Sequence, residues 1–187
     1  MENLKKQIEN YVPYDEQEEK DKEYFLKFIN DFDDVLTRNN EYGHFSGSAF
    51  VVNKDRTKML AVWHNIYEGW IFPGGHADGI ANLIEVARRE VEEETGVKSK
   101  LLDENFSSID SLPCIGHMKR GKYVSAHIHL NVTFLLEADD TINLKVKADE
   151  NSGVKWISFE DACNDDIVDF ARPIHKKIIE KIIANKL

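Results

Sequence analysis

Cysteine is scarce in this sequence. Its 187 residues include only two cysteines, Cys114 and Cys163, which lie 49 positions apart and form no CxxC pair. This spacing predicts two reduced thiols in a cytoplasmic protein rather than a disulfide or a reactive pair. The sequence also lacks low-complexity tracts and repeats with a period typical of solenoid proteins.

Long hydrophobic runs and a basic excess are absent as well. No stretch approaches the roughly 18 apolar residues of a transmembrane helix, and residues 1–6 lack the apolar core of a signal peptide. The formal net charge is -10, from 24 Lys and Arg against 34 Asp and Glu. We therefore expect no membrane partner and no nucleic-acid partner, because both require a basic surface. A small phosphate ligand is still compatible, since a bound cation inverts the local field.

The first 40 residues differ in composition from the rest of the chain. They contain eleven acidic and six basic residues and no glycine. Apolar residues recur at helical spacing on both sides of Pro13, which predicts two amphipathic helices, the second reaching Leu36. We interpret residues 1–40 as an N-terminal helical extension and residues 41–187 as the main domain. We expect the extension to pack on that domain; the alternatives are a dimer contact or a wall of the substrate pocket.

Strand and helix patterns alternate from residue 44 onwards. The periodicity predicts strands at 46–52, 58–64, 70–72, 97–102, 107–117, 123–137 and 154–157, with helices at 81–95 and 170–184. With 42% hydrophobic residues the chain has enough apolar side chains for a core. The pattern predicts an α/β fold in which helices cover a mixed sheet.

One predicted helix carries a cluster of acids. Asn82 and Glu85 have the spacing of a capping box at its start. Glu90, Glu93 and Glu94 follow at i, i+3 and i+4, so their carboxylates share one face near the helix C-terminus, where anions are disfavoured. A hard divalent cation such as Mg²⁺ would offset this repulsion. Without further context, a solvated acidic face is the alternative interpretation.

The residues around this cluster form a longer pattern. They comprise a glycine, a fourteen-residue spacing to an arginine, and the run REVEEETGV: Gly75, Arg89, Glu90, Val91, Glu93, Glu94, Gly96 and Val97. This pattern resembles the signature of the Nudix hydrolases, and the resemblance covers about residues 44–184. It implies a Nudix-type α/β/α sandwich that hydrolyses a nucleoside diphosphate linked to another moiety, with Mg²⁺ or Mn²⁺ as cofactor. The implied partner is a small nucleotide-type molecule, and a homodimer is compatible with the family.

The resemblance also implies roles for individual residues. Glu90, Glu93 and Glu94 would bind the metal, with the Gly74 carbonyl as a further ligand by analogy. The other implied roles are catalytic: Arg89 would orient a carboxylate, and the general base would be either a glutamate of the signature or one on a later loop, for which Glu150 is the best candidate by position. Aromatic and charged residues elsewhere are candidates for substrate binding: His44, Arg56, Trp70, His127 and His129. The HxH pair formed by the last two is interpreted as strand packing or cleft lining in preference to a zinc site.

One position departs from the family pattern. The first glutamate of the signature is replaced by Ala81. In the family that glutamate usually pairs with the arginine of the signature, and we hypothesise that Glu85 or Asp78 partly replaces it. The departure leaves a second interpretation open, in which the domain binds a nucleotide as a sensor with little or no turnover.

Overall fold

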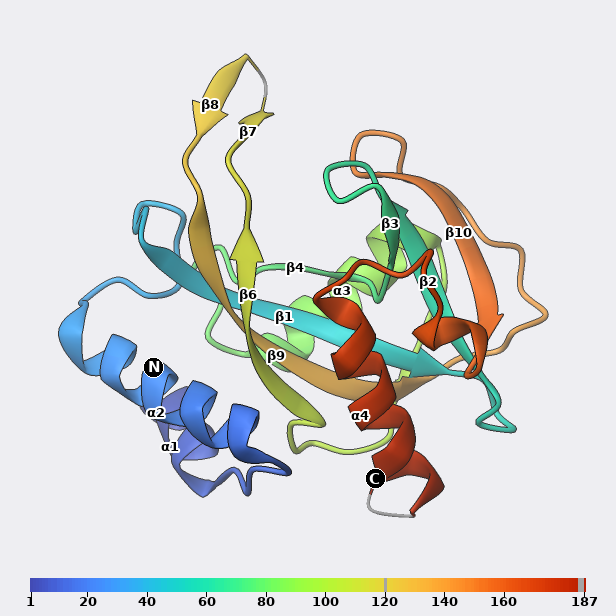
Figure 1. Cartoon of the computed structure of the whole chain (residues 1–187), viewed down its shortest axis with the longest axis horizontal. Helices are drawn as coiled ribbons and strands as arrows, with labels where there is room; N and C mark the ends of the chain where they lie inside the picture. The colour runs from blue at the N-terminus through green and yellow to red at the C-terminus, as the bar shows by residue number, and fades with distance from the viewer. Residues whose placement is uncertain (120, 185–186) are drawn as a thin grey trace.

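A mixed β-sheet lies at the centre of the molecule (Figure 1). The computed structural model describes residues 1–119, 121–184 and 187. The helices are α1 (Glu2–Asn10), α2 (Glu16–Asp31), α3 (Leu83–Thr95) and α4 (Ala171–Ile183), with a short 3-10 turn at Asp161–Cys163. The strands are β1 (Gly43–Val52), β2 (Lys58–His64), β3 (Gly69–Ile71), β4 (Gly74–His76), β5 (Lys100–Leu101), β6 (Ser108–Cys114), β7 (His117–Lys119), β8 (Lys122–Val124), β9 (His127–Glu137) and β10 (Asn151–Ser158).

The main sheet has the strand order β10-β2-β1-β9-β5, with β3 added to β2, β4 to β1 and β6 to β9. Strands β1 and β9 run parallel along their length, whereas the other pairs of this sheet are antiparallel. This arrangement confirms the predicted mixed sheet. Strands β7 and β8 form a separate hairpin that projects from the body of the molecule (Figure 1).

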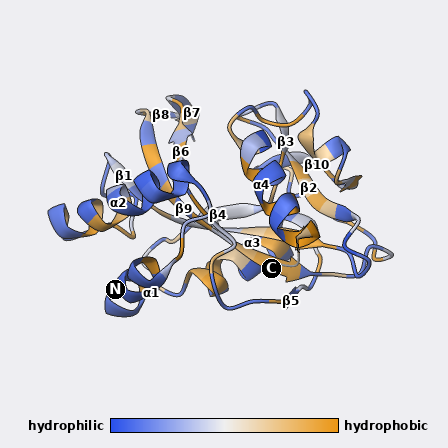
Figure 2. Ribbon diagram, turned by 60° about the horizontal axis from the view of Figure 1, so that its bottom comes forward, coloured by the Kyte–Doolittle hydropathy of each residue, from blue (hydrophilic) through white to orange (hydrophobic). Residues whose placement is uncertain are grey.

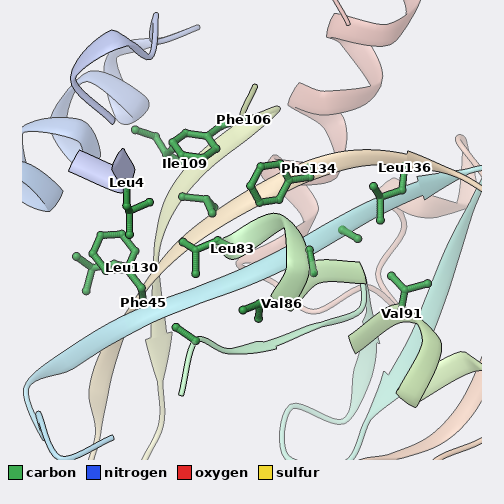
Figure 3. Close-up of a cluster of buried hydrophobic side chains, with 14 of the residues drawn as sticks. Leu4, Phe45, Leu83, Val86, Val91, Phe106, Ile109, Leu130, Phe134 and Leu136 are labelled. Carbon is green, nitrogen blue, oxygen red and sulfur yellow. The ribbon is translucent and has the colours of Figure 1, made fainter. Parts of the chain in front are cut away.

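Two apolar cores lie on the two faces of the sheet. One lies between the sheet and α3, and it also receives Leu4 and Phe25 from the N-terminal helices (Figure 3). The other lies under α4 and contains Ile174 and Ile178. The hydropathy colouring shows hydrophilic residues alternating with hydrophobic ones along α1 and α2, as expected for helices with one buried side (Figure 2).

The alternation of side chains along β1 decides which residues reach which face. Phe45 belongs to the core on the α3 side, and a Cβ added to Gly47 would lie 2.7 Å from the carbonyl oxygen of Leu83 in α3. Phe50 belongs to the core under α4. Successive residues of a strand point to opposite faces, so His44 lies on the face away from α3.

The N-terminal helices are packed against the sheet rather than extended from it. Glu18 of α2 is fully buried, and its carboxylate lies 2.9 Å from the ammonium of Lys177 and 3.2 Å from that of Lys181, both in α4. The predicted second helix was too long, because α2 ends at Asp31. The carboxylate of Asp34 accepts hydrogen bonds from the N–H groups of Leu36 and Thr37, which stabilises a turn there. The division into residues 1–40 and 41–187 stays a prediction.

Smaller differences concern the segment around α3. The short strand β4 was not predicted, because its sequence, Gly-Gly-His, has no strand pattern. Asn82 does precede the first residue of α3, but its side chain makes no capping hydrogen bond, so the predicted capping box does not form. Gly96 ends the helix with a φ of 71°, as its position after the helical pattern predicts.

Two further expectations concern the cysteines and the helices. Cys114 and Cys163 are free, which agrees with the sequence-based prediction. Among the helices described, none is long and apolar enough to cross a bilayer.

Candidate active site

Two glycines bring the backbone of β4 against the acidic face of α3. The N–H of Gly74 donates a hydrogen bond to a carboxylate oxygen of Glu94 at 3.0 Å. A Cβ added to Gly75 would lie 2.4 Å from the carboxyl carbon of Glu90, closer than any side chain allows. Gly75 of the signature therefore permits a close approach, and the two glycines together place two of the predicted metal ligands against one short strand.

Arg89 organises the neighbouring carboxylates. Its guanidinium donates to Glu90 at 2.7 Å and lies 3.9 Å from Glu93, one turn further along α3. It also donates to the carbonyl oxygen of His76 at 3.4 Å, which connects the helix to β4. These contacts agree with a role in orienting carboxylates.

Lys147 joins the helix to the loop before β10. Its ammonium lies 3.0 Å from a carboxylate oxygen of Glu93 and 3.0 Å from one of Glu150. The charge of Glu150 is also among the influences that raise the pKa of Glu90 and Glu94. The fold thus brings Glu150 into the electrostatic environment of the α3 carboxylates. Sequence reasoning missed Lys147, although a lysine three residues before Glu150 is a recognisable ion-pair spacing.

Burial changes the proton affinity of Glu90 and Glu94. Burial raises the pKa of Glu94 to about 8, although the hydrogen bond from Gly74 acts in the opposite direction. Burial likewise raises the pKa of Glu90, against the effect of Arg89. Buried carboxylates that crowd together are costly to ionise, and such costs concentrate at functional sites. Carboxylates on one helix face, with the ammonium of Lys147 already between two acids, fit a hard divalent cation.

Three of the predicted substrate-binding residues gather in a different place. His44, His127 and His129 lie together with His76, and one ring nitrogen from each is within 4.8 Å of the others. Their strands are adjacent, because β1 pairs with both β4 and β9. His76 was missed, since the sequence alone does not show that β4 pairs with β1.

Arg56 and Trp70 lie apart from both groups. Arg56 follows the far end of β1, and its guanidinium donates to the carbonyl oxygen of Leu187 at 3.1 Å. Trp70 packs edge to face on Trp63, with 5.4 Å between ring centroids, and the ammonium of Lys155 lies 4.1 Å from the Trp70 ring. The structure therefore does not bring these two residues to the α3 carboxylates.

The two residues hypothesised to replace the missing signature glutamate differ in their contacts. Glu85 is exposed in the first turn of α3, and within the described residues no ion pair joins it to Arg89. Asp78 has both carboxylate oxygens engaged by Arg38, at 2.8 and 2.7 Å, although its charge still acts on Arg89. Of the two hypothesised replacements for the missing glutamate, Asp78 is the one whose charge is among the main influences on the pKa of Arg89.

Comparisons with known proteins agree with this geometry. Residues 44–182 match the NUDIX domain family. The chain is 32% identical over 137 residues to a protein of Pelagibacter ubique named RNA pyrophosphohydrolase, an alignment that covers 71% of this chain and 86% of that relative.

Two solved structures share the fold. A NUDIX-family hydrolase from Clostridium perfringens aligns with a TM-score of 0.53 and 19% identity, over 74% of this chain and 97% of that one. A C. elegans Ap4A hydrolase aligns with a TM-score of 0.53 and 17% identity, over 76% of this chain and 96% of that one. These similarities confirm the predicted α/β/α sandwich.

Proposed function

The chain belongs to the Nudix hydrolase family, and from that premise we propose that it is a metal-dependent pyrophosphohydrolase acting on a nucleotide-type substrate. The observation that carries the proposal is the contact between β4 and α3. There, Gly74 anchors Glu94, and Gly75 admits Glu90. This is the arrangement that the residues of the signature require.

The proposed metal ligands are the carboxylates of Glu90, Glu93 and Glu94, with the Gly74 carbonyl as a further ligand. Mg²⁺ or Mn²⁺, when bound there, would neutralise charge on the pyrophosphate and lower the pKa of a water molecule. Arg89 would hold Glu90 in place, since it donates to that side chain at 2.7 Å.

Glu150 is the proposed general base, which would accept a proton from the attacking water. Its position supports this role, because Lys147 bridges it to Glu93. The ammonium of Lys147 would hold the Glu150 carboxylate close to the acids of α3. Replacing Glu150 by Gln should therefore lower kcat by at least about 100-fold and leave metal affinity nearly unchanged.

The substrate is proposed only at the level of a nucleotide with a pyrophosphate linkage. The Pelagibacter relative is named for an activity on RNA, whereas the net charge of -10 argues against a broad RNA-binding surface. An RNA 5′-end offers the same pyrophosphate chemistry as a small nucleotide. The absence of a nucleic-acid partner therefore stays a prediction. The cytoplasmic location and the homodimer are also still predictions.

A substrate panel tests the proposal. The full chain is assayed with Mg²⁺ and with Mn²⁺ on oxidised nucleoside triphosphates, ADP-ribose, dinucleoside polyphosphates, nucleotide sugars and a short RNA bearing a 5′-triphosphate. We expect metal-dependent release of phosphate or of a mononucleotide from at least one member, and its loss in Glu93→Gln. Tight binding of one member without turnover of any would instead support the sensor interpretation that Ala81 leaves open.

A further inference from the structure

Four histidines meet on the face of the sheet away from α3. His44 comes from β1, His76 from β4, and His127 and His129 from β9. The parallel register pairs His44 with His129, and the antiparallel register pairs His76 with Ser46, so three neighbouring strands contribute. Ring centroids of His44 lie 5.0 Å from His76, 4.9 Å from His127 and 5.2 Å from His129.

Backbone carbonyls determine the tautomer of two of these rings. The Nδ1 atom of His127 lies 2.8 Å from the carbonyl oxygen of Ser125, and that of His44 lies 3.2 Å from the carbonyl oxygen of Asn40. A carbonyl oxygen only accepts hydrogen bonds, so each Nδ1 carries the proton and each Nε2 presents a lone pair. Histidines that bind metals commonly donate their other ring N–H to a carbonyl in this way.

The lone pair of His44 lacks a protein partner. His44 is 3% exposed, and its Nε2 atom is buried without a hydrogen-bond partner. The Nε2 atom of His127 lies 3.1 Å from the Nε2 atom of His129. A buried nitrogen that lacks a partner is costly, and a metal ion would satisfy it.

The distances suit a small tetrahedral ion. Bonds of about 2.0–2.1 Å from Zn²⁺ to each imidazole place the nitrogens about 3.3 Å apart. The His127–His129 nitrogens are already at 3.1 Å, and all four lie within 4.8 Å of one another. Arg38 acts on these rings through its charge, but it is paired with Asp78 through two contacts; the charge of Lys119 also acts on His76.

We propose that His44, His76, His127 and His129 form a binding site for a transition-metal ion of the Zn²⁺ class, separate from the carboxylate site on α3. Imidazole nitrogens favour Zn²⁺, Ni²⁺ and Cu²⁺, whereas carboxylate oxygens favour Mg²⁺ and Mn²⁺, so the two sites select different metals. Four protein ligands fill a tetrahedral shell, which is typical of structural sites.

The histidine site would act on the carboxylate site of α3 through strand β4. His76 directly follows Gly75, and its carbonyl oxygen accepts the hydrogen bond from Arg89. A metal bound to His76 would join β4 to both β1 and β9, and it would hold the glycines in the position that Glu90 and Glu94 require. The proposed role is to stabilise this strand, without contact with the reacting phosphate.

Metal binding by the full chain tests the site directly. Isothermal titration with ZnCl₂ is carried out in excess Mg²⁺, so that the carboxylate site is saturated. We expect one Zn²⁺ per chain, and the Kd should rise by at least about 100-fold in His127→Gln, because even the loss of an indirect partner costs 10–100-fold. Titration with Co²⁺ should give the visible absorption of a four-coordinate ion.

His117 provides a matched control. Its Nδ1 atom lies 2.8 Å from the carbonyl oxygen of Ile115, the same local contact that His127 makes with Ser125, yet it is outside the cluster. His117→Gln should bind Zn²⁺ as the wild type does, and Glu94→Gln should do so too. Zn²⁺ should raise the Tm of the wild type and of His117→Gln but not of His127→Gln.

Several results would overturn the site. One is the absence of stoichiometric Zn²⁺ binding by the wild type, which would leave strand packing or contact with a substrate base as the role of these rings. Another is unchanged affinity in His127→Gln together with loss in Glu94→Gln, which would assign the ion to the carboxylates. An absorption spectrum typical of six-coordinate Co²⁺ would also contradict the proposal. This measurement uses the wild type alone, so it does not depend on the folding of a variant.

Discussion

Glu94 accepts a hydrogen bond from the backbone N–H of Gly74 at 3.0 Å, although 20 residues separate them in the sequence. The bond crosses from the last turn of α3 to the start of β4, which are the two halves of the catalytic signature. It also gives a buried carboxylate one of the few partners that its surroundings offer. Glu94 therefore has two roles, one in the fold and one in the proposed metal site, and a substitution can separate them.

Glu94→Gln should separate stability from catalysis. The amide oxygen of Gln can still accept the Gly74 hydrogen bond, and burial already favours the neutral form of Glu94, so the Tm without metal should be nearly unchanged. Hydrolysis should fall by roughly 100-fold or more, because a metal contributes several kcal/mol to transition-state stabilisation. Thermal unfolding and steady-state kinetics on the same sample measure both. A parallel loss of Tm and rate would assign Glu94 a mainly structural role.

Lys147→Gln should strengthen the binding of divalent cations to the α3 acids. The substitution removes an ammonium that lies 3.0 Å from Glu93 and from Glu150, and leaves each carboxylate with one fewer positive neighbour. We expect the Kd for Mg²⁺, measured by calorimetry without substrate, to fall by roughly tenfold, about 1.4 kcal/mol. Lys155→Gln is the control, because that lysine lies over Trp70 instead. Weaker Mg²⁺ binding in Lys147→Gln would contradict the prediction.

Glu18→Ala should destabilise the whole fold. Glu18 is fully buried between Lys177 and Lys181, and its removal leaves two buried ammonium groups with one fewer partner. Loss of one member of a buried ion pair typically costs about 3–5 kcal/mol. Urea denaturation followed by circular dichroism measures the change in the free energy of unfolding.

Lys20 supplies the comparison on the same helix. It pairs with Glu23 at 2.9 Å, and both side chains are about two-thirds exposed, at 66% and 67%. Lys20→Ala should leave the free energy of unfolding nearly unchanged, because an exposed ion pair contributes little to stability. If both variants had the same small effect, α2 would not be coupled to α4 through Glu18, and the helical extension would behave as a separate unit.

His175 should make stability depend on pH in the acid range. Its ring is fully buried against Phe50 and Phe72, and burial lowers its pKa to about 4. In the unfolded chain this histidine has a pKa near 6.5, so it binds a proton there at a higher pH than in the folded protein. The contribution of neutral His175 to stability is therefore fully present above about pH 6.5 and is lost as the pH falls from about 6.5 to 4. The contribution is on the order of 3 kcal/mol.

His175→Asn tests this dependence. The His175 Nδ1 atom lies 2.8 Å from the carbonyl oxygen of Ala162, and the Asn amide can donate to the same oxygen without titrating in this range. The free energy of unfolding, measured in urea at pH 7, 6, 5 and 4, should fall less steeply in the variant. The slope of the free energy of unfolding against pH is compared between wild type and variant, because a cavity left by the substitution would lower stability equally at every pH. Equal slopes would exclude His175 as the source.

Much of the fold and part of the candidate site could be predicted from the sequence, because both depend on local spacing. The period of α3 places Glu90, Glu93 and Glu94 on one face, and Gly96 ends the helix. The strand predicted at 58–64 matches β2 to the residue. Such features follow from residues a few positions apart, where the geometry of helix or strand allows few alternatives.

Only the tertiary structure decided which distant segments meet. Lys147 reaches Glu93 because a loop before β10 folds back over α3. His76 joins His44 and His129 because β4 and β9 both pair with β1. A single sequence does not encode these neighbours in any local period, since register and strand order are set by the packing of the whole sheet. The acids of the signature were therefore determined by the sequence, whereas the lysine between two acids and the four-histidine cluster were determined by the fold.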